Sequence, residues 1–356
     1  MVEITKTVNS APQRGGGWRP SVALAILSPL IAEVLSGATR FSVVFALVPE
    51  ILVWGCGTLV IRELVRRWRG GWTSMLLLGL GLSIAEEFLI QQTSLAPLPF
   101  PGALAHYGRA WGVNWIYFLF MLGYESVWVV LVPVQLTELF FRSRRHAPWL
   151  RNRGLVIAIF LFLIGSRVAW FAWIKRVRPV IFHLPAYHPG ARIIESGVLA
   201  IMLLSILAYS LRRVRNEKPD SAAAAPPVWG VVVLGFVLGS PWYALMRFVF
   251  AAEEPHVAFG LIMAGGIAWA VLVYLVLSRL ARFGTWSDMH RWALTFGSTL
   301  LSMVAGFSGS STWKPVDIYG KTVLNLLAVI AFFLLLSSLR RYQLGGQPTA
   351  EDSYGR

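Results

Sequence analysis

Apolar residues run through the chain in long stretches that short polar segments separate. A helix needs about 20 residues to cross a bilayer, and the stretches are of that length. The pattern therefore predicts about ten transmembrane helices. They are expected near residues 19–37, 41–61, 72–93, 112–141, 154–174, 194–211, 228–250, 257–278, 292–310 and 322–339.

Composition supports this pattern. The 356 residues have a mean hydropathy of +0.62, and only 14% of them are charged. No stretch remains for a soluble domain, so the expected fold class is all-α, a polytopic integral membrane helix bundle whose partner is the lipid bilayer. The single cysteine, Cys56, excludes a disulfide framework.

The net charge of +15 bears on the orientation of the chain in the membrane and not on its fold class. Lys and Arg gather in short clusters at the ends of the apolar runs, which is typical of membrane topology, and no nucleic-acid partner is expected. Most of the 32 basic residues lie in alternate segments, which predicts a multi-pass protein of the cell membrane with both termini cytoplasmic. The outer segment 175–193 is an exception, because it carries four basic residues. Arg167 and Arg247 fall within predicted spans.

One polar segment divides the chain. Residues 212–227, RRVRNEKPDSAAAAPP, combine charge, an alanine run and paired prolines, which predicts a cytoplasmic linker. The expected organisation is a six-span part over 1–211, this linker, a four-span part over 228–341 and a cytoplasmic tail over 342–356. Glycine and serine in the later spans, such as Gly260, Gly265 and Gly266, favour close helix packing.

Acidic residues lie inside the apolar runs of the first part, where a carboxylate is costly to bury. They are Glu33, Glu50, Glu86, Glu87, Glu125 and Glu138. Counting from the basic end of each span places Glu33, Glu86 and Arg167 at the same depth, about 21 Å along the helix. Prolines one turn before Glu33 and beside Glu50 predict irregular helix at those acids.

The third span carries a polar stripe on one helix face, with Glu86 at its edge. Its members recur every three or four residues and are Gly79, Ser83, Glu87, Gln91 and Ser94. Two neighbouring carboxylates do not both ionise easily in a low dielectric unless a cation lies beside them. We expect Arg167 to form an ion pair with a glutamate of the first or third span.

Two other acids have a simpler interpretation. Glu63 stands four residues before Arg67, and Glu138 stands four before Arg142. Both pairs lie near span ends, so we expect surface ion pairs there. The candidate site is accordingly Glu86, Glu87, Glu125 and Arg167. No residue pattern identifies a cofactor or a metal.

The segment LLLGLGLSIAEEFLIQQTSLAP resembles the first motif, EExxxR, of the CPBP family of CAAX-processing and bacteriocin-processing intramembrane proteases. Glu86 and Glu87 match, and Gln91 stands in place of the arginine. In the second motif, FxxxH, Met121 and Glu125 stand in place of the phenylalanine and the histidine, and the third motif, HxxxN, has no match. The resemblance covers residues 72–130 and implies a glutamate-activated water that attacks a peptide bond.

Three functions remain open. The first, which the sequence favours, is a diverged CPBP-type hydrolase of a membrane peptide or its inactive descendant, with Glu86 or Glu87 as general base and Arg167 in place of the missing arginine. The second is a transporter or channel in which the carboxyl groups handle protons or a small cation. The third is a structural membrane protein without a site. A hydrolase needs a lateral opening at the glutamate pair, whereas a transporter needs a path to both faces.

Overall fold

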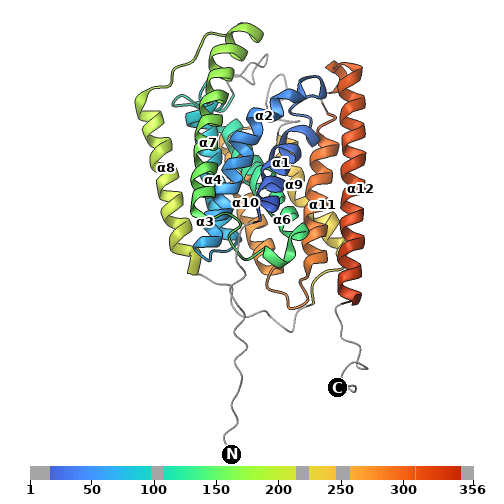
Figure 1. The fold of residues 1–356 in the computed structure, drawn as a ribbon. Coiled ribbons are helices and arrows are strands. Elements are labelled where there is room, and N and C mark those ends of the chain that lie inside the picture. Colours follow the sequence, from blue (N-terminus) through green and yellow to red (C-terminus); the bar gives the residue numbers. More distant parts are fainter. Residues whose placement is uncertain (1–16, 98–106, 214–223, 246–256, 309, 346–356) are drawn as a thin grey trace, which may run out of the picture.

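Helices make up almost the whole of the computed structural model, which describes residues 17–97, 107–213, 224–245, 257–308 and 310–345 (Figure 1). Most of the predicted spans consist of one or more helical segments that continue one another. Their bounds are Trp18–Leu35, Phe41–Arg67, Trp72–Ile90, Trp115–Phe140, Asn152–Ile181, Ala191–Ser210, Val228–Ala244, Phe259–Leu280, Asp288–Ala305 and Pro315–Gly345.

Eight of these helices are long and apolar enough to cross a membrane, which confirms the predicted all-α membrane bundle within the described residues. Of the other two, α9 (Val228–Ala244) is apolar but shorter, and α11 (Asp288–Ala305) begins with polar residues. Much of α11 is buried, including Trp292, Thr299 and Ser302. It therefore lies inside the bundle, where hydroxyl groups can bond to neighbouring backbone.

Peripheral helices surround this core. In Figure 1, α8 (Ala191–Ser210) lies at one edge and α12 (Pro315–Gly345) at the other. Exposed apolar side chains cover α7 (Asn152–Ala172), α8, α10 (Phe259–Leu280) and α12, as expected for surfaces that face lipid. The buried core spans both predicted parts of the chain, and the Trp128 indole in the first part donates to the Ser298 carbonyl in the second at 3.0 Å.

Contacts between loops show that the helices alternate in direction. At one end, Arg62 bonds to Ala147, Arg145 pairs with Asp288, and the Arg142 guanidinium lies over the Tyr342 ring. At the opposite end, Ser42 donates to Asp317 and Arg178 donates to Pro97. The predicted inner and outer segments therefore gather at opposite ends of the bundle. We call the first of these the arginine-rich end.

Close helix packing depends on glycines other than most of those singled out from the sequence. A Cβ on Gly297 of α11 would overlap the Val232 carbonyl oxygen of α9, so only glycine allows this approach. A Cβ on Gly260 or Gly265, by contrast, would have no neighbouring atom within 4 Å, so the prediction of close packing was wrong for them. Gly266 does approach a neighbour, Leu119.

Two features of the sequence lie largely outside the described residues. Of the predicted linker 212–227, the structure describes 212–213 and 224–227, and Arg247 is not described.

The one sheet in the described part is a short antiparallel hairpin of β1 (Arg109–Ala110) and β2 (Val113–Asn114). It precedes α5 (Trp115–Tyr124), where the Asn114 side chain accepts from the Tyr117 N–H and caps the helix.

Candidate functional site: a cluster of intramembrane glutamates

The intramembrane glutamates lie at π-helical turns. Glu86 and Glu87 begin η4 (Glu86–Ile90), Glu125 begins η6 (Glu125–Leu131), and Glu33 lies within η1 (Leu30–Leu35). Glu50 ends α2 (Leu47–Glu50) and immediately precedes η3 (Ile51–Gly55). The irregular helix predicted at Glu33 and Glu50 is thus confirmed. Such turns are rare in proteins and are frequent at functional sites.

These turns bring the carboxylates together. Glu86 interacts electrostatically with Glu87 and Glu33, and Glu125 interacts with Glu86, Glu87 and Glu33. Glu33 in turn interacts with Glu50. Glu86, Glu87 and Glu125 are each at most 1% exposed. We call these five residues, Glu33, Glu50, Glu86, Glu87 and Glu125, the glutamate cluster.

Glu87 is held firmly on one side only. Its Oε2 atom accepts from the Thr93 hydroxyl at 2.6 Å, the Ser94 N–H at 2.7 Å and the Ser94 hydroxyl at 2.6 Å. Its Oε1 atom is buried without a hydrogen-bond partner. The arrangement fixes the orientation of the carboxyl group and leaves one oxygen for a ligand or a proton.

The other two candidate acids are less satisfied. Both carboxyl oxygens of Glu86 and both of Glu125 are buried without a hydrogen-bond partner. Leaving a buried charge in this condition is costly, whereas a carboxyl group that carries a proton avoids most of that cost. Ser83 lies close enough to Glu125 for its hydroxyl to donate to the carboxyl group, although its oxygen has no partner within normal hydrogen-bond geometry. Polar atoms without partners therefore gather around this point of the bundle.

A single threonine joins the remaining pair. The Thr39 hydroxyl lies 2.5 Å from Glu50 Oε1 and 3.4 Å from Glu33 Oε2. A hydroxyl has one proton to donate, so it satisfies both carboxylates only if one of them carries a proton of its own. Thr39 and Thr93 were not identified from the sequence. Ser94 was expected on the polar stripe, but it lies beyond the end of the helix and reaches Glu87 from the following turn.

Arg167 is not part of this cluster. It lies on an exposed face of α7, with its guanidinium 4.2 Å from the centre of the Trp170 ring, and it takes part in none of the ion pairs between described residues. The predicted ion pair with a glutamate was therefore wrong. The inward face of α7 is marked by Gly165, where a Cβ would lie 2.5 Å from Leu52. Two residues further along a helix is about 200° around it, so Arg167 points away.

Glu63 and Glu138 also differ from expectation. Arg62 Nη1 bonds to Glu63 at 2.9 Å, and Arg66 forms a bidentate pair with Glu138 at 2.7 Å. Arg62, Glu63 and Glu138 are at most 2% exposed, so the prediction of surface pairs with Arg67 and Arg142 was wrong. Arg62 Nε also bonds to Glu138 at 3.2 Å. These acids are fully partnered, in contrast to the glutamate cluster.

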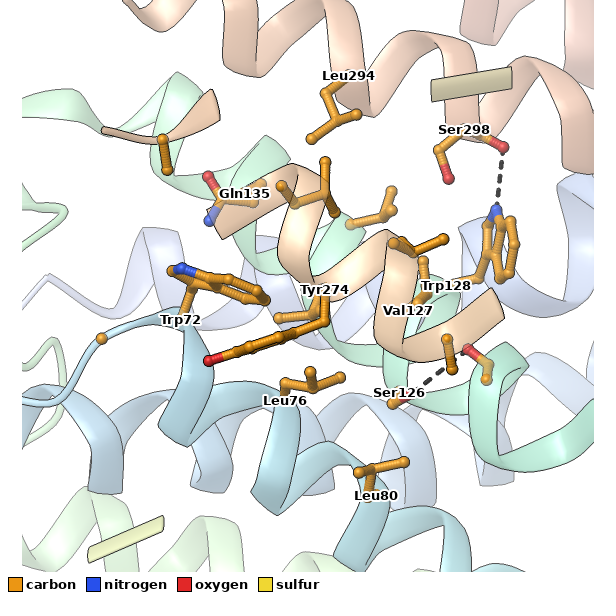
Figure 2. A pocket seen from close by; sticks show the side chains of 18 of the residues that line it. Trp72, Leu76, Leu80, Ser126, Val127, Trp128, Gln135, Tyr274, Leu294 and Ser298 are labelled. Carbon is orange, nitrogen blue, oxygen red and sulfur yellow. Dashed lines mark hydrogen bonds between the residues drawn. The ribbon is translucent and has the colours of Figure 1, made fainter. Parts of the chain in front are cut away.

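The glutamate cluster does not form a direct chelate. Among the described residues, no group of three or more His, Cys, Asp and Glu side chains is placed to hold a metal ion. A large cavity of about 1460 Å³ lies nearby (Figure 2), and Gly123 and Ser126 contribute to its wall. None of the five glutamates lines it. Carboxyl groups that are close together but buried can exchange protons or hold a partly hydrated cation.

Comparisons with known proteins give no match to any family model, curated protein or solved structure. The resemblance to the CPBP proteases consequently stays a prediction based on Glu86 and Glu87.

Proposed function

We propose that this chain is a transport protein of the cell membrane in which Glu86, Glu87 and Glu125 take up and release protons or a small cation. The observation that carries the proposal is the set of buried carboxyl oxygens that have neither a hydrogen-bond partner nor a basic side chain paired with them. Buried acids without a counter-ion are typical of proton relays and ion pathways in membrane proteins. In this proposal the arginine-rich end and both termini are cytoplasmic.

The shape of the site supports this function. Four helices contribute to the glutamate cluster, and each has a π-helical turn there. Irregular backbone is tolerated at membrane depth where it is buried in protein or lines a water-filled path. The Thr39 contact with two carboxyl groups extends the cluster from Glu33 to Glu50, toward the loop at 36–40. A chain of acids of this kind provides successive positions for one proton.

Hydrolysis of a membrane peptide is the second candidate. It is favoured by Glu87, because Thr93 and Ser94 orient its carboxyl group while Oε1 remains free to bind water. The position of Arg167 counts against it, since Arg167 does not replace the arginine that the CPBP motif would supply. Glu86 and Glu87 also do not line the large cavity, so the cavity does not bring a peptide to them.

Proton and cation flux in proteoliposomes tests the proposal. The purified chain is reconstituted into vesicles that contain a dye sensitive to pH, Na⁺ or K⁺, and a gradient of the matching ion is imposed in each case. We expect flux of one of these ions. Glu86→Gln and Glu125→Gln should each lower it by at least about tenfold, because an amide cannot take up and release a proton or balance the charge of a cation. A tenfold loss corresponds to about 1.4 kcal/mol. Glu195→Gln is the matched control, since Glu195 lies exposed on α8.

Two results would contradict transport. The first is flux that is equal in the wild type, the cluster variants and Glu195→Gln. The second is cleavage of a transmembrane peptide library that is lost in Glu87→Gln, which would establish the hydrolase instead.

A further inference from the structure

The large cavity has the length of a lipid chain. It lies between α10 on one side and α4 (Trp72–Ala85), η6 and α9 on the others. Along α10 its lining runs from Ile267 to the residue that caps the helix, Ala281, which is about 21 Å at the rise of an α-helix. One leaflet of a bilayer supplies about 15 Å of hydrocarbon, so the cavity can take an acyl chain at full length.

The inner walls of the cavity are apolar. Leu76 and Leu80 of α4 face Leu294 of α11 across it, as Figure 2 shows. Two of the polar side chains here bond to backbone carbonyls, since Ser126 donates to Leu122 at 2.5 Å and the Trp128 indole donates to Ser298 at 3.0 Å. An apolar space of this kind binds water poorly and takes hydrocarbon readily.

One end of the cavity is basic. Arg66, Arg67, Arg69, Arg212 and Arg291 all line it at the arginine-rich end, and no Asp or Glu lines it among the described residues. Glu138 neutralises Arg66, and Arg67 donates to Asn152 and Leu150. Arg69, Arg212 and Arg291 form no ion pair with any described acid. They leave an excess of positive charge beside an apolar chamber.

Two details sharpen the character of this mouth. Burial, and then the charges of Arg145 and Arg66, lower the pKa of His146, so this lining residue is neutral at pH 7 and the charge comes from arginine. Arg69 has a φ of 59°, a left-handed conformation that is uncommon for a residue other than glycine. This conformation closes the C-terminus of α3 (Cys56–Arg67), where the Gly70 N–H donates to the Val65 carbonyl at 2.8 Å, and it places Arg69 at the mouth of the cavity.

An apolar chamber with a basic mouth fits a ligand that has a hydrocarbon chain and a negatively charged head. We propose that the cavity binds one phospholipid with an anionic headgroup, its phosphate at Arg69, Arg212 and Arg291 and its chains between α4, η6 and α10. Arginine matches the geometry of phosphate oxygens and holds them by two parallel hydrogen bonds. Basic pockets between transmembrane helices are known binding positions for anionic lipid headgroups. This inference does not depend on ion transport by the glutamate cluster.

Lipid binding can be measured directly by native mass spectrometry. The purified protein is titrated with phosphatidylglycerol and, separately, with phosphatidylcholine. We expect one tightly held phosphatidylglycerol and weaker binding of phosphatidylcholine. Arg69→Gln with Arg291→Gln should weaken phosphatidylglycerol binding by about fivefold for each arginine, which corresponds to about 1 kcal/mol per basic group. Arg151→Gln with Arg153→Gln is the matched control, because these exposed arginines lie at the same end and outside the cavity.

Blocking the chamber gives a second, independent measurement. Val273 of α10 lines the cavity, whereas its neighbour Leu272 is exposed and does not. Val273→Trp should reduce phosphatidylglycerol binding at least as much as the arginine changes, and Leu272→Trp should leave it unchanged. Equal binding of the two lipids, or equal losses in the arginine pair and its control, would overturn the proposal. Unchanged binding in Val273→Trp would place the lipid elsewhere on the bundle.

Discussion

Two kinds of buried acid coexist in this bundle. Glu63 and Glu138 have their charge balanced by arginine, and Glu63 also accepts the backbone N–H groups of Trp149 and Leu150. Glu86 and Glu125 have no such partners. A satisfied ion pair contributes structure, whereas an unsatisfied carboxyl group is free to bind a proton or a cation. The distinction between structural and functional acids therefore depends on their partners and not on depth alone.

Arg62 should be essential for stability. It bonds to both Glu63 and Glu138, donates to the backbone carbonyls of Ala147 and Arg145, and packs its guanidinium 3.4 Å from the centre of the Trp149 ring. We expect Arg62→Met to lower the free energy of unfolding by about 3–5 kcal/mol, because it leaves buried acids without compensation.

The control for this change is Arg145→Met. Arg145 pairs with Asp288 while both side chains are about a quarter exposed, so the loss should stay below about 1 kcal/mol. Denaturation of both variants in mixed micelles gives the comparison. Similar losses in free energy of unfolding for the two variants would show that the buried network contributes no more to stability than the partly exposed pair.

Glu87 offers a prediction that separates shape from charge. Glu87→Ala removes the acceptor of the Ser94 N–H and should cost about 1–3 kcal/mol, because that donor is left buried and unsatisfied. Glu87→Gln keeps a carbonyl oxygen in the same place and should fold nearly as well, while losing any function that needs a proton or a charge. Thermal stability in detergent, measured beside ion flux, distinguishes the two effects. Equal stability of the two variants would show that the Ser94 contact contributes little.

The residue scale also shows what sequence reasoning can recover. Counting residues from the span ends correctly grouped Glu33 with Glu86, because depth follows directly from helical rise. The same count failed for Arg167, since depth does not say which way a side chain points around its helix. Thr93 was not identified from the sequence, and Ser94 was assigned to the polar stripe of the helix. Both reach Glu87 from a turn after the helix, where no periodic pattern applies.

At the scale of elements, α9 and α11 form the closest helix pair of the second part. Gly297 of α11 meets the Val232 carbonyl, and Gly235 of α9 meets the Leu294 carbonyl. Contacts of this kind occur where small residues let two backbones approach. The sequence indicated the general device through its glycine content. It could not identify the right glycines, because many glycines of a membrane helix face lipid.

Alanine substitution tests this packing. Gly297→Ala should lower the free energy of unfolding by about 1–3 kcal/mol, because the new methyl group overlaps backbone that cannot move aside. Gly265→Ala on α10 is the matched control, since no atom lies within 4 Å of its added Cβ. That change should be neutral or slightly stabilising. A smaller loss at Gly297 than at Gly265 would mean that α9 and α11 separate easily.

At the scale of the whole molecule, the alternation of helix ends was the most predictable property. The basic clusters that the sequence assigned to one side do meet in space, as the bonds from Arg67 to Asn152 and from Arg145 to Asp288 show. Charge at span ends is a local feature of the sequence and survives folding unchanged. The division into two parts says less, because one core runs through both.

Cysteine labelling tests the proposed orientation. Cys56 is buried, so Cys56→Ser gives a background without other thiols. Ser143→Cys lies exposed at the arginine-rich end, and His188→Cys lies exposed at the opposite end. In intact cells, an impermeant reagent should label the second and spare the first, because basic loops stay in the cytoplasm. The reverse pattern would invert the orientation.

The π-helical turns have a consequence for how such a site arises. Each turn closes its hydrogen bond over one residue more than an α-helix does, so it is equivalent to a single added codon within an otherwise regular helix. Removing that residue would let the turn revert to α-helix with both flanking halves near their present register, while side chains within the turn would shift by about 100° around the helix axis. Gain or loss of the glutamate cluster is therefore accessible through one-residue insertions and deletions, without any exchange of the acids themselves.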